Sequence, residues 1–208
     1  MKTEQVHVKN DGSGIERALA IPDNFAQTVK LNKKDALHLR LISEEMLGLV
    51  RAITGEFEAD FWIEGDDKTG KICLEADVIM DAQKRRQLLA SSTSGKNEEA
   101  KGVLGKIKEL IVVGIENYEE VSKLQMMYGG SPLNYGAMGV ENIEMSQAVI
   151  TWSLQQYRNK VAETNDEDNA AESAWDELEK SVLANLADDV RVGINKDKVR
   201  INIYKSFS

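Results

Sequence analysis

The fold of this chain is decided by residues 31–81, in which LNKKDALHLRLISEEMLGLVRAITG (31–55) precedes EADFWIEGDDKTGKICLEADVIMD (58–81). The first part predicts a helix, because apolar residues recur in it at spacings of three and four. Asn32 is placed to cap its start, Asp35 adds a carboxylate at its positive end, and Gly55 is a typical stop. The predicted core-facing stripe consists of Leu39, Ile42, Met46, Leu49, Val50 and Ile53. A flank that could line a cleft consists of His38, Leu41, Glu45, Gly48 and Ala52.

The second part predicts a β-hairpin, because apolar and polar residues alternate on both sides of a loop rich in Gly and Asp at 65–70. One face should lie on the helix and the other nearer to solvent. A second hairpin, with its turn at 195–197, closes the chain. Its core-facing residues are expected to be Val192, Ile194, Val199, Ile201 and Ile203. Its wetter face is expected to carry Arg191, Lys198, Arg200 and Asn202.

The remaining segments predict a short strand within residues 3–9 and otherwise helices. Ser13 is expected to cap the helix that follows it, and Pro22 to break or kink that helix. Further helices are expected at 82–90, 98–116 and 143–163, and a last one is marked by Trp175, Leu178, Val182 and Leu186. A Ser/Gly linker at 91–97, a long loop at 126–139 and an acidic loop at 164–169 separate them. The element order predicts an α+β sandwich, an antiparallel or mixed sheet with helices on one face, as one domain over 1–208.

The composition narrows the classes of function. The 208 residues carry a net charge of −9, which argues against nucleic acid or an anionic membrane as the main partner. A single cysteine, Cys73, excludes an internal disulfide framework and a cysteine-based metal site. With no signal peptide and no apolar run long enough to span a membrane, we expect a cytoplasmic protein.

Two stretches of the chain resemble a known family. Residues 41–49, LISEEMLGL, and the hairpin that ends near Asp81 resemble the first signature helix and strand pair of the Bergerat (GHKL) ATPases. Residues 176–181, DELEKS, and 185–205 resemble that family's last helix and final hairpin. The nearest members are the anti-sigma-factor serine kinases. The resemblance implies a two-layer α/β sandwich of Bergerat type with a helical insertion at about 82–173.

The resemblance also indicates which residues would take part in magnesium binding and catalysis with ATP. The family uses a Glu-x-x-x-Asn helix, in which Glu acts on the nucleophile and Asn holds Mg²⁺. If Glu44 is that Glu, Gly48 stands at the Asn position; if it is Glu45, Leu49 does. Neither Gly48 nor Leu49 has a side-chain oxygen for a hard cation.

Two further family features are altered. Asp77 matches the Asp that contacts adenine, but Val78 and Ile79 follow it where the family has a glycine-containing turn. Before the last helix, where the family has a glycine-rich lid, this chain has the acidic run 165–169, which would repel a triphosphate. The resemblance therefore implies a degenerate nucleotide site, and we predict no ATP hydrolysis.

Each candidate residue has a structural alternative. Glu44 and Glu45 could be a catalytic base or solvated carboxylates beside Arg40 or Arg51. Asp77 and Asp81 could be a remnant adenine contact or a metal site, or could simply end a strand.

The other reactive side chains are expected to be structural. His7 and His38 lie on different predicted elements, which argues against a catalytic triad or a zinc site. Cys73 is expected to be a small sheet residue, since nothing near it in sequence suggests an activated thiol.

The loop at 126–139 is unusual because it combines glycine with methionine and tyrosine. Its glycines could cradle a ligand or form a movable lid, its methionines could adapt to a partner protein, or the loop could be a packed connector. The candidate ligand-binding glycines are Gly129, Gly130, Gly136 and Gly139.

Two functional hypotheses follow from these patterns. The first is a regulatory or protein-binding module without a cofactor, whose partner is a transcription or signalling component. The alternative is an ATP- and magnesium-dependent serine/threonine kinase or ATPase with a divergent site. It would keep Glu44 or Glu45 with Asp77 and use the glycines of 126–139 as a displaced lid.

Overall fold

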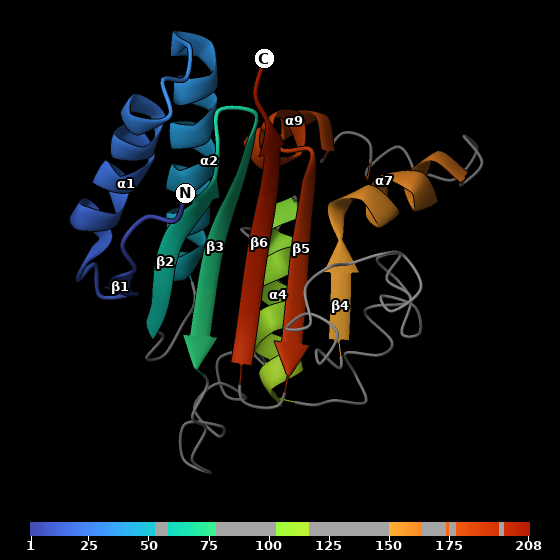
Figure 1. The fold of residues 1–208 in the computed structure, drawn as a ribbon. Helices are drawn as coiled ribbons and strands as arrows, with labels where there is room; N and C mark the ends of the chain where they lie inside the picture. The colour runs from blue at the N-terminus through green and yellow to red at the C-terminus, as the bar shows by residue number, and fades with distance from the viewer. Residues whose placement is uncertain (53–57, 78–102, 117–149, 164–173, 175–177, 196–197) are drawn as a thin grey trace.

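The computed structural model describes residues 1–52, 58–77, 103–116, 150–163, 174, 178–195 and 198–208 (Figure 1). The elements are β1 (Val6–Lys9), α1 (Ile15–Thr28), α2 (Lys33–Ala52), β2 (Glu58–Gly65), β3 (Thr69–Asp77), α4 (Val103–Glu116), β4 (Ile150–Ser153), α7 (Leu154–Glu163), α9 (Val182–Leu186), β5 (Asp189–Asn195) and β6 (Lys198–Ser206).

The strands form one antiparallel sheet in the order β1-β2-β3-β6-β5-β4. Both predicted hairpins, β2–β3 and β5–β6, are confirmed, and they join at the centre of the sheet, where Ile72 lies opposite Ile203. The short N-terminal strand is confirmed as β1. The mixed α/β class is therefore confirmed, with an antiparallel sheet built from both ends of the chain.

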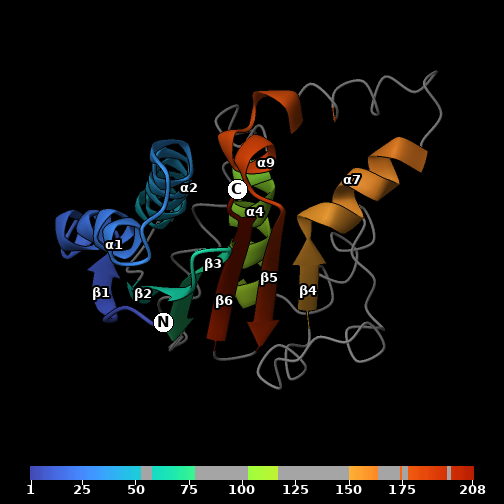
Figure 2. The same cartoon turned by 45° about the horizontal axis from the view of Figure 1, so that its top comes forward.

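Helices α1, α2 and α4 cover one face of this sheet (Figure 2). The sheet side chains that point toward them include six that are at most 1% exposed: Phe61, Ile63, Ile72, Leu74, Ile201 and Ile203. On α2 the predicted stripe is confirmed over Leu39, Ile42, Met46, Leu49 and Val50, each at most 3% exposed. Ile53 and Gly55 lie outside the described residues. One apolar core thus joins sheet and helices.

The start of α2 confirms the predicted cap. The Asp35 N–H donates to Asn32 Oδ1 at 2.9 Å, and Asn32 Nδ2 donates to Asp35 Oδ2 at 2.6 Å. The chain end also reaches this corner, because the Ser208 N–H donates to Asp35 Oδ2 at 2.8 Å. This reciprocal capping fixes the first turn of α2 and ties the end of the chain to it.

The structure corrects the predicted cap of α1 and shows no break at Pro22. Ser13 does not cap the helix: the N-cap is Gly14, with φ of 77°, and it makes no side-chain capping bond. A Cβ at Gly14 would lie 2.0 Å from the His7 carbonyl oxygen, so close backbone approach requires glycine here. The helix also continues through Pro22, whose side chain is buried beside Ile21, and this packing outweighs the missing N–H.

The predicted long helix at 143–163 is wrong over residues 150–153. These residues form β4, which pairs with β5 through Trp152 opposite Val192, and helix α7 begins only at Leu154. Ile150, Thr151 and Trp152 are β-branched or aromatic residues that suit a strand, and they pair with β5 at the edge of the sheet. The stretch that we expected to be all-helical therefore supplies an edge strand.

The expected last helix is interrupted at Ser181. Residues 178–180 are helical, and α9 then starts afresh, because Ser181 Oγ accepts from the Ala184 N–H at 3.2 Å. The Ser181 side chain thus acts as the N-cap of a new helix, and the helical turn before it ends there. Trp175 and the segments expected at 82–90, 91–97, 126–139 and 164–169 lie outside the described residues.

In the closing hairpin, the five side chains expected in the core are confirmed, each at most 2% exposed. Asn202 is a correction: it is only 2% exposed although it belongs to the face opposite the helices. Its strand is central, and the short side chain lies between Cys73 on one neighbouring strand and Arg191 on the other.

Among the helices that the structure describes, none combines the length and the apolar character needed to cross a membrane.

Candidate functional site

The flank of α2 beside its buried stripe carries the carboxylates Glu44 and Glu45. Both side chains are half-buried, and Gly48 is exposed one turn further on. A Cβ added at Gly48 would meet nothing within 4 Å apart from the helix itself. This face therefore has room beside it, but its most open position offers no ligand atom.

Glu44 has an ion-pair partner. Arg40 Nε donates to Glu44 Oε1 at 2.9 Å, and Arg40 Nη1 donates to Asp23 Oδ2 on α1 at 2.7 Å. The arginine thus links the two helices through one carboxylate on each. For Glu44 this matches the alternative of a solvated carboxylate beside Arg40.

Leu49, the alternative occupant of the metal-ligand position, belongs to the core. It is 3% exposed and packs in the same apolar cluster as Met46 and Val50. An oxygen ligand placed there would be buried among hydrocarbon side chains, where an unpaired polar group is costly.

The other predicted nucleotide residues are only partly placed. Asp77 is the last residue of β3 and lies opposite Lys198 on β6, at the end of the strand pair. Asp81, Gly129, Gly130, Gly136 and Gly139 lie outside the described residues. The structure therefore brings Glu44, Glu45 and Gly48 together on one helix face.

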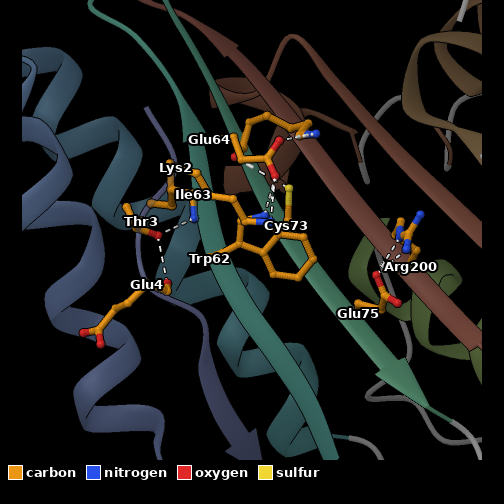
Figure 3. Close-up of polar contacts among 10 residues, drawn as sticks. Lys2, Thr3, Glu4, Trp62, Ile63, Glu64, Cys73, Glu75 and Arg200 are labelled. Atoms are coloured by element: carbon orange, nitrogen blue, oxygen red, sulfur yellow. Dashed lines mark hydrogen bonds and ion pairs between the residues drawn. The ribbon is translucent and has the colours of Figure 1, made fainter. Parts of the chain in front are cut away.

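The sheet face turned away from the helices carries a network of charged groups around Trp62 (Figure 3). The Glu64 carboxylate accepts from Trp62 Nε1 at 2.7 Å and pairs with Lys71 Nζ at 2.7 Å and Lys2 Nζ at 3.4 Å. Burial alone would raise the pKa of Glu64, but these donors outweigh it and lower the pKa to about 2. A carboxylate this acidic is a poor general base at neutral pH.

Cys73 and Glu75 lie on the same face (Figure 3). Burial raises the pKa of the Cys73 thiol to about 12, so it is not a nucleophile at neutral pH. Glu75 pairs with Lys198 at 3.1 Å and accepts from Arg200 Nε at 2.9 Å. Burial works to raise the pKa of Glu75, but these cations lower it. On this face, the carboxylates of Glu64 and Glu75 are therefore already paired with cations.

His7 lies on the edge strand β1 between two carboxylates. Its Nδ1 is 3.0 Å from Asp60 Oδ1 and its Nε2 is 3.1 Å from Glu58 Oε2. The hydrogen bond with Asp60, aided by Glu58 and opposed by partial burial, raises the pKa of His7. His38 lies on α2. Within the described parts of the chain, no three His, Cys, Asp or Glu side chains converge as a metal site.

Sequence reasoning missed the constellation at the start of α7. Asp189 Oδ1 accepts from Ser153 Oγ at 3.2 Å and from the Gln155 N–H at 3.1 Å, and Asp189 Oδ2 accepts from Arg191 Nε at 2.8 Å. Ser153 Oγ also accepts from the Gln156 N–H at 3.2 Å. Ser153 and Asp189 thus cap a helix. No local signal could have paired residues 36 positions apart.

Comparison of the chain with protein-family models, with curated proteins and with solved structures finds no match.

Proposed function

We propose that this chain is a regulatory, protein-binding module on a scaffold of the Bergerat ATPase type, with a nucleotide site too degenerate for catalysis. Its partner is a protein, and the resemblance to anti-sigma-factor kinases points to a component of transcription or signalling. The observation that carries the proposal concerns α2. Four residues after Glu44 and Glu45, where the family has the asparagine that holds magnesium, this chain has Gly48 and Leu49, which have no side-chain oxygen.

The packing of α2 supports this proposal. Leu49 is part of the core, so a small rotation of the helix that would present it to a ligand would also remove Met46 and Val50 from their contacts. Gly48 faces open space but contributes no side chain. Mg²⁺ needs oxygen ligands in near-octahedral geometry, and phosphoryl transfer needs that metal to bridge the phosphate oxygens.

The charge of the chain supports it as well. At a net charge of −9, the chain has to offset the charge of a triphosphate locally. On the sheet face away from the helices, Lys71 and Arg200 already pair with Glu64 and Glu75. Those cations are not free to hold phosphate.

One observation favours the alternative, an ATP-dependent kinase or ATPase with a divergent site. Glu44 and Glu45 are both half-buried on α2, and Gly48, three residues after Glu45, faces open space. This alternative requires Asp77 and the glycines of 126–139 to complete a site that departs from the family pattern.

Calorimetric titration of the chain with Mg·ATP separates the two functions. The proposal predicts no saturable heat at millimolar nucleotide, or at best weak binding that does not depend on magnesium. Micromolar, magnesium-dependent binding accompanied by turnover would refute the proposal. A Leu49→Asn variant, which restores the amide that the family uses, should not gain magnesium-dependent binding, because position 49 faces the core.

A further inference from the structure

The exposed side of the first turns of α2 carries a large apolar side chain. Leu37 is 55% exposed, the highest value among the large apolar side chains that the structure describes. It points away from the buried stripe, and its neighbour one turn on, Leu41, is half-buried. Leaving a leucine in water forgoes the stabilisation of burying it elsewhere.

Lysines surround this leucine. Lys33 and Lys34 precede Leu37 by four and three residues, so they are its neighbours on the helix surface, and Lys30 lies just before the helix. All three lysines are exposed, and none takes part in an ion pair that the structure shows among the described residues. Arg40, the next cation, is already paired with Asp23 and Glu44. The three lysines thus form a cluster of exposed positive charge on an otherwise acidic chain, whereas Asp35 in the same turn is buried and hydrogen-bonded to Asn32 and Ser208.

This arrangement costs stability. Lys33 and Lys34 occupy the first turn of α2, where the helix dipole is positive and a cation is unfavourable. The N–H groups of that turn are not a binding element themselves, since Asn32 already accepts from one of them and Asp35 is hydrogen-bonded to the end of the chain. Positions that break local rules without a compensating contact are where a functional surface is expected.

We propose that Lys30, Lys33, Lys34 and Leu37 form a docking surface for an acidic segment of a partner protein that carries an apolar anchor. The anchor covers Leu37, and the partner's carboxylates pair with the three lysines. This inference rests on the proposed protein-binding function and names the chemistry of the partner. Because the surface consists of one leucine and three lysines in and just before the first turns of α2, the interface should be small, transient and sensitive to salt.

A synthetic peptide of about 15 residues, rich in Glu and Asp with leucines four positions apart, is a suitable probe for this helix face. Fluorescence anisotropy of the labelled peptide is measured against the full chain at about 50 mM and about 300 mM NaCl. We expect saturable binding at the lower salt concentration that weakens severalfold at the higher. A peptide with serine in place of each leucine should bind at least about tenfold more weakly, since it lacks the anchor.

Variants of the chain locate the binding surface. Lys34→Glu should weaken binding by about tenfold, whereas Lys160→Glu, the same charge change on α7 beside the far edge strand β4, should leave it unchanged. Leu37→Ser should weaken binding by about tenfold, and Leu37→Met, which keeps an apolar side chain, should retain it. Thermal unfolding of each variant checks that the fold is intact. The Leu37 variants should unfold near the temperature of the parent because Leu37 is exposed, and Lys34→Glu should unfold at the same or a slightly higher temperature because it removes a cation from the positive end of α2.

Three results would overturn the inference: no binding of the acidic leucine peptide at low salt, equal binding of the serine peptide, or equal weakening by Lys160→Glu and Lys34→Glu. The nucleotide experiments are independent of these. A chain that hydrolyses Mg·ATP but binds the peptide through Leu37 would refute the proposed function and keep the docking surface. If the chain binds neither ATP nor the peptide, the docking surface is refuted and the proposed function is not.

Discussion

Replacing Leu49 with alanine tests whether this position on α2 is structural or faces a ligand site. Leu49 is 3% exposed and belongs to the single apolar core that joins α2 to the sheet. A position that faced a nucleotide cleft would tolerate a smaller side chain. A core position should not.

The magnitude follows from the burial of Leu49. The substitution deletes three carbon atoms, and at about 0.8 kcal/mol for each buried methylene the lost transfer free energy is about 2.4 kcal/mol. A residual cavity adds to this, because surrounding side chains relax only in part, so the expected loss is about 2–5 kcal/mol. Position 49 lies within one rigid helix, which limits that relaxation.

Equilibrium unfolding in urea measures this loss. With a denaturant slope of about 2–3 kcal/mol per molar, the unfolding midpoint should fall by about 0.7–2.5 M. Gly48→Ala is the matched control on the neighbouring position. The added Cβ meets open space, so this variant should gain about 0.5–1 kcal/mol from helix propensity.

The opposite pattern would refute this reasoning. A loss below about 1 kcal/mol for Leu49→Ala would place that side chain outside the core. A destabilised Gly48→Ala variant would show that the glycine, and not the leucine, faces packed structure.

Three further predictions concern single side chains. Asp35→Ala should cost about 1–3 kcal/mol in urea unfolding, because the amide of Ser208 and the capping amide lose a buried acceptor. The two β2 carboxylates raise the pKa of His7, so NMR titration should place it above 6.5. The stability that His7 contributes is present below its unfolded pKa and is lost as pH rises through the folded pKa. Cys73, with a thiol pKa of about 12, should resist alkylation by iodoacetamide at about pH 8 until the chain unfolds, as read by mass spectrometry.

Each of these predictions has a clear contrary result. An Asp35→Ala chain as stable as the parent would mean that the contacts of Ser208 contribute nothing. A His7 pKa that does not fall in an Asp60→Asn variant would assign the shift to another cause, whereas Glu16→Gln on the exposed side of α1 should leave it unchanged. Rapid labelling of Cys73 in the folded chain would contradict its burial.

The sequence predicted the parts of the fold that rest on local periodicity. Alternation located both hairpins, helical spacing identified the buried stripe of α2, and Asn32 marked its cap. The predictions failed where a distant partner decides the local structure. Residues 150–153 form a strand because they pair with β5 at the edge of the sheet. The N-cap of α1 is Gly14, where the nearby His7 carbonyl leaves no room for a side chain.

The candidate site was predictable only in outline. Helical spacing placed Glu45 and Gly48 on one flank of α2 outside the buried stripe, and in the structure Glu45 is half-buried and Gly48 exposed. The pairing of Glu44 with Arg40 was among the alternatives, but the link from Arg40 to Asp23 depends on how α1 packs on α2. The exposed Leu37 had a visible signal, since it falls outside the apolar stripe and follows two lysines, but only the structure gives its exposure.

The most direct test of the central claim is steady-state release of radiolabelled phosphate from Mg·ATP, measured for the chain and for its Glu44→Ala/Glu45→Ala variant. The variant removes both carboxylates that could serve catalysis and leaves the buried stripe of α2 intact. We predict that the chain and the variant release phosphate at the same background rate, with no dependence on magnesium. Magnesium-dependent release by the chain that the double substitution abolishes would show a working ATP site and contradict the proposed function.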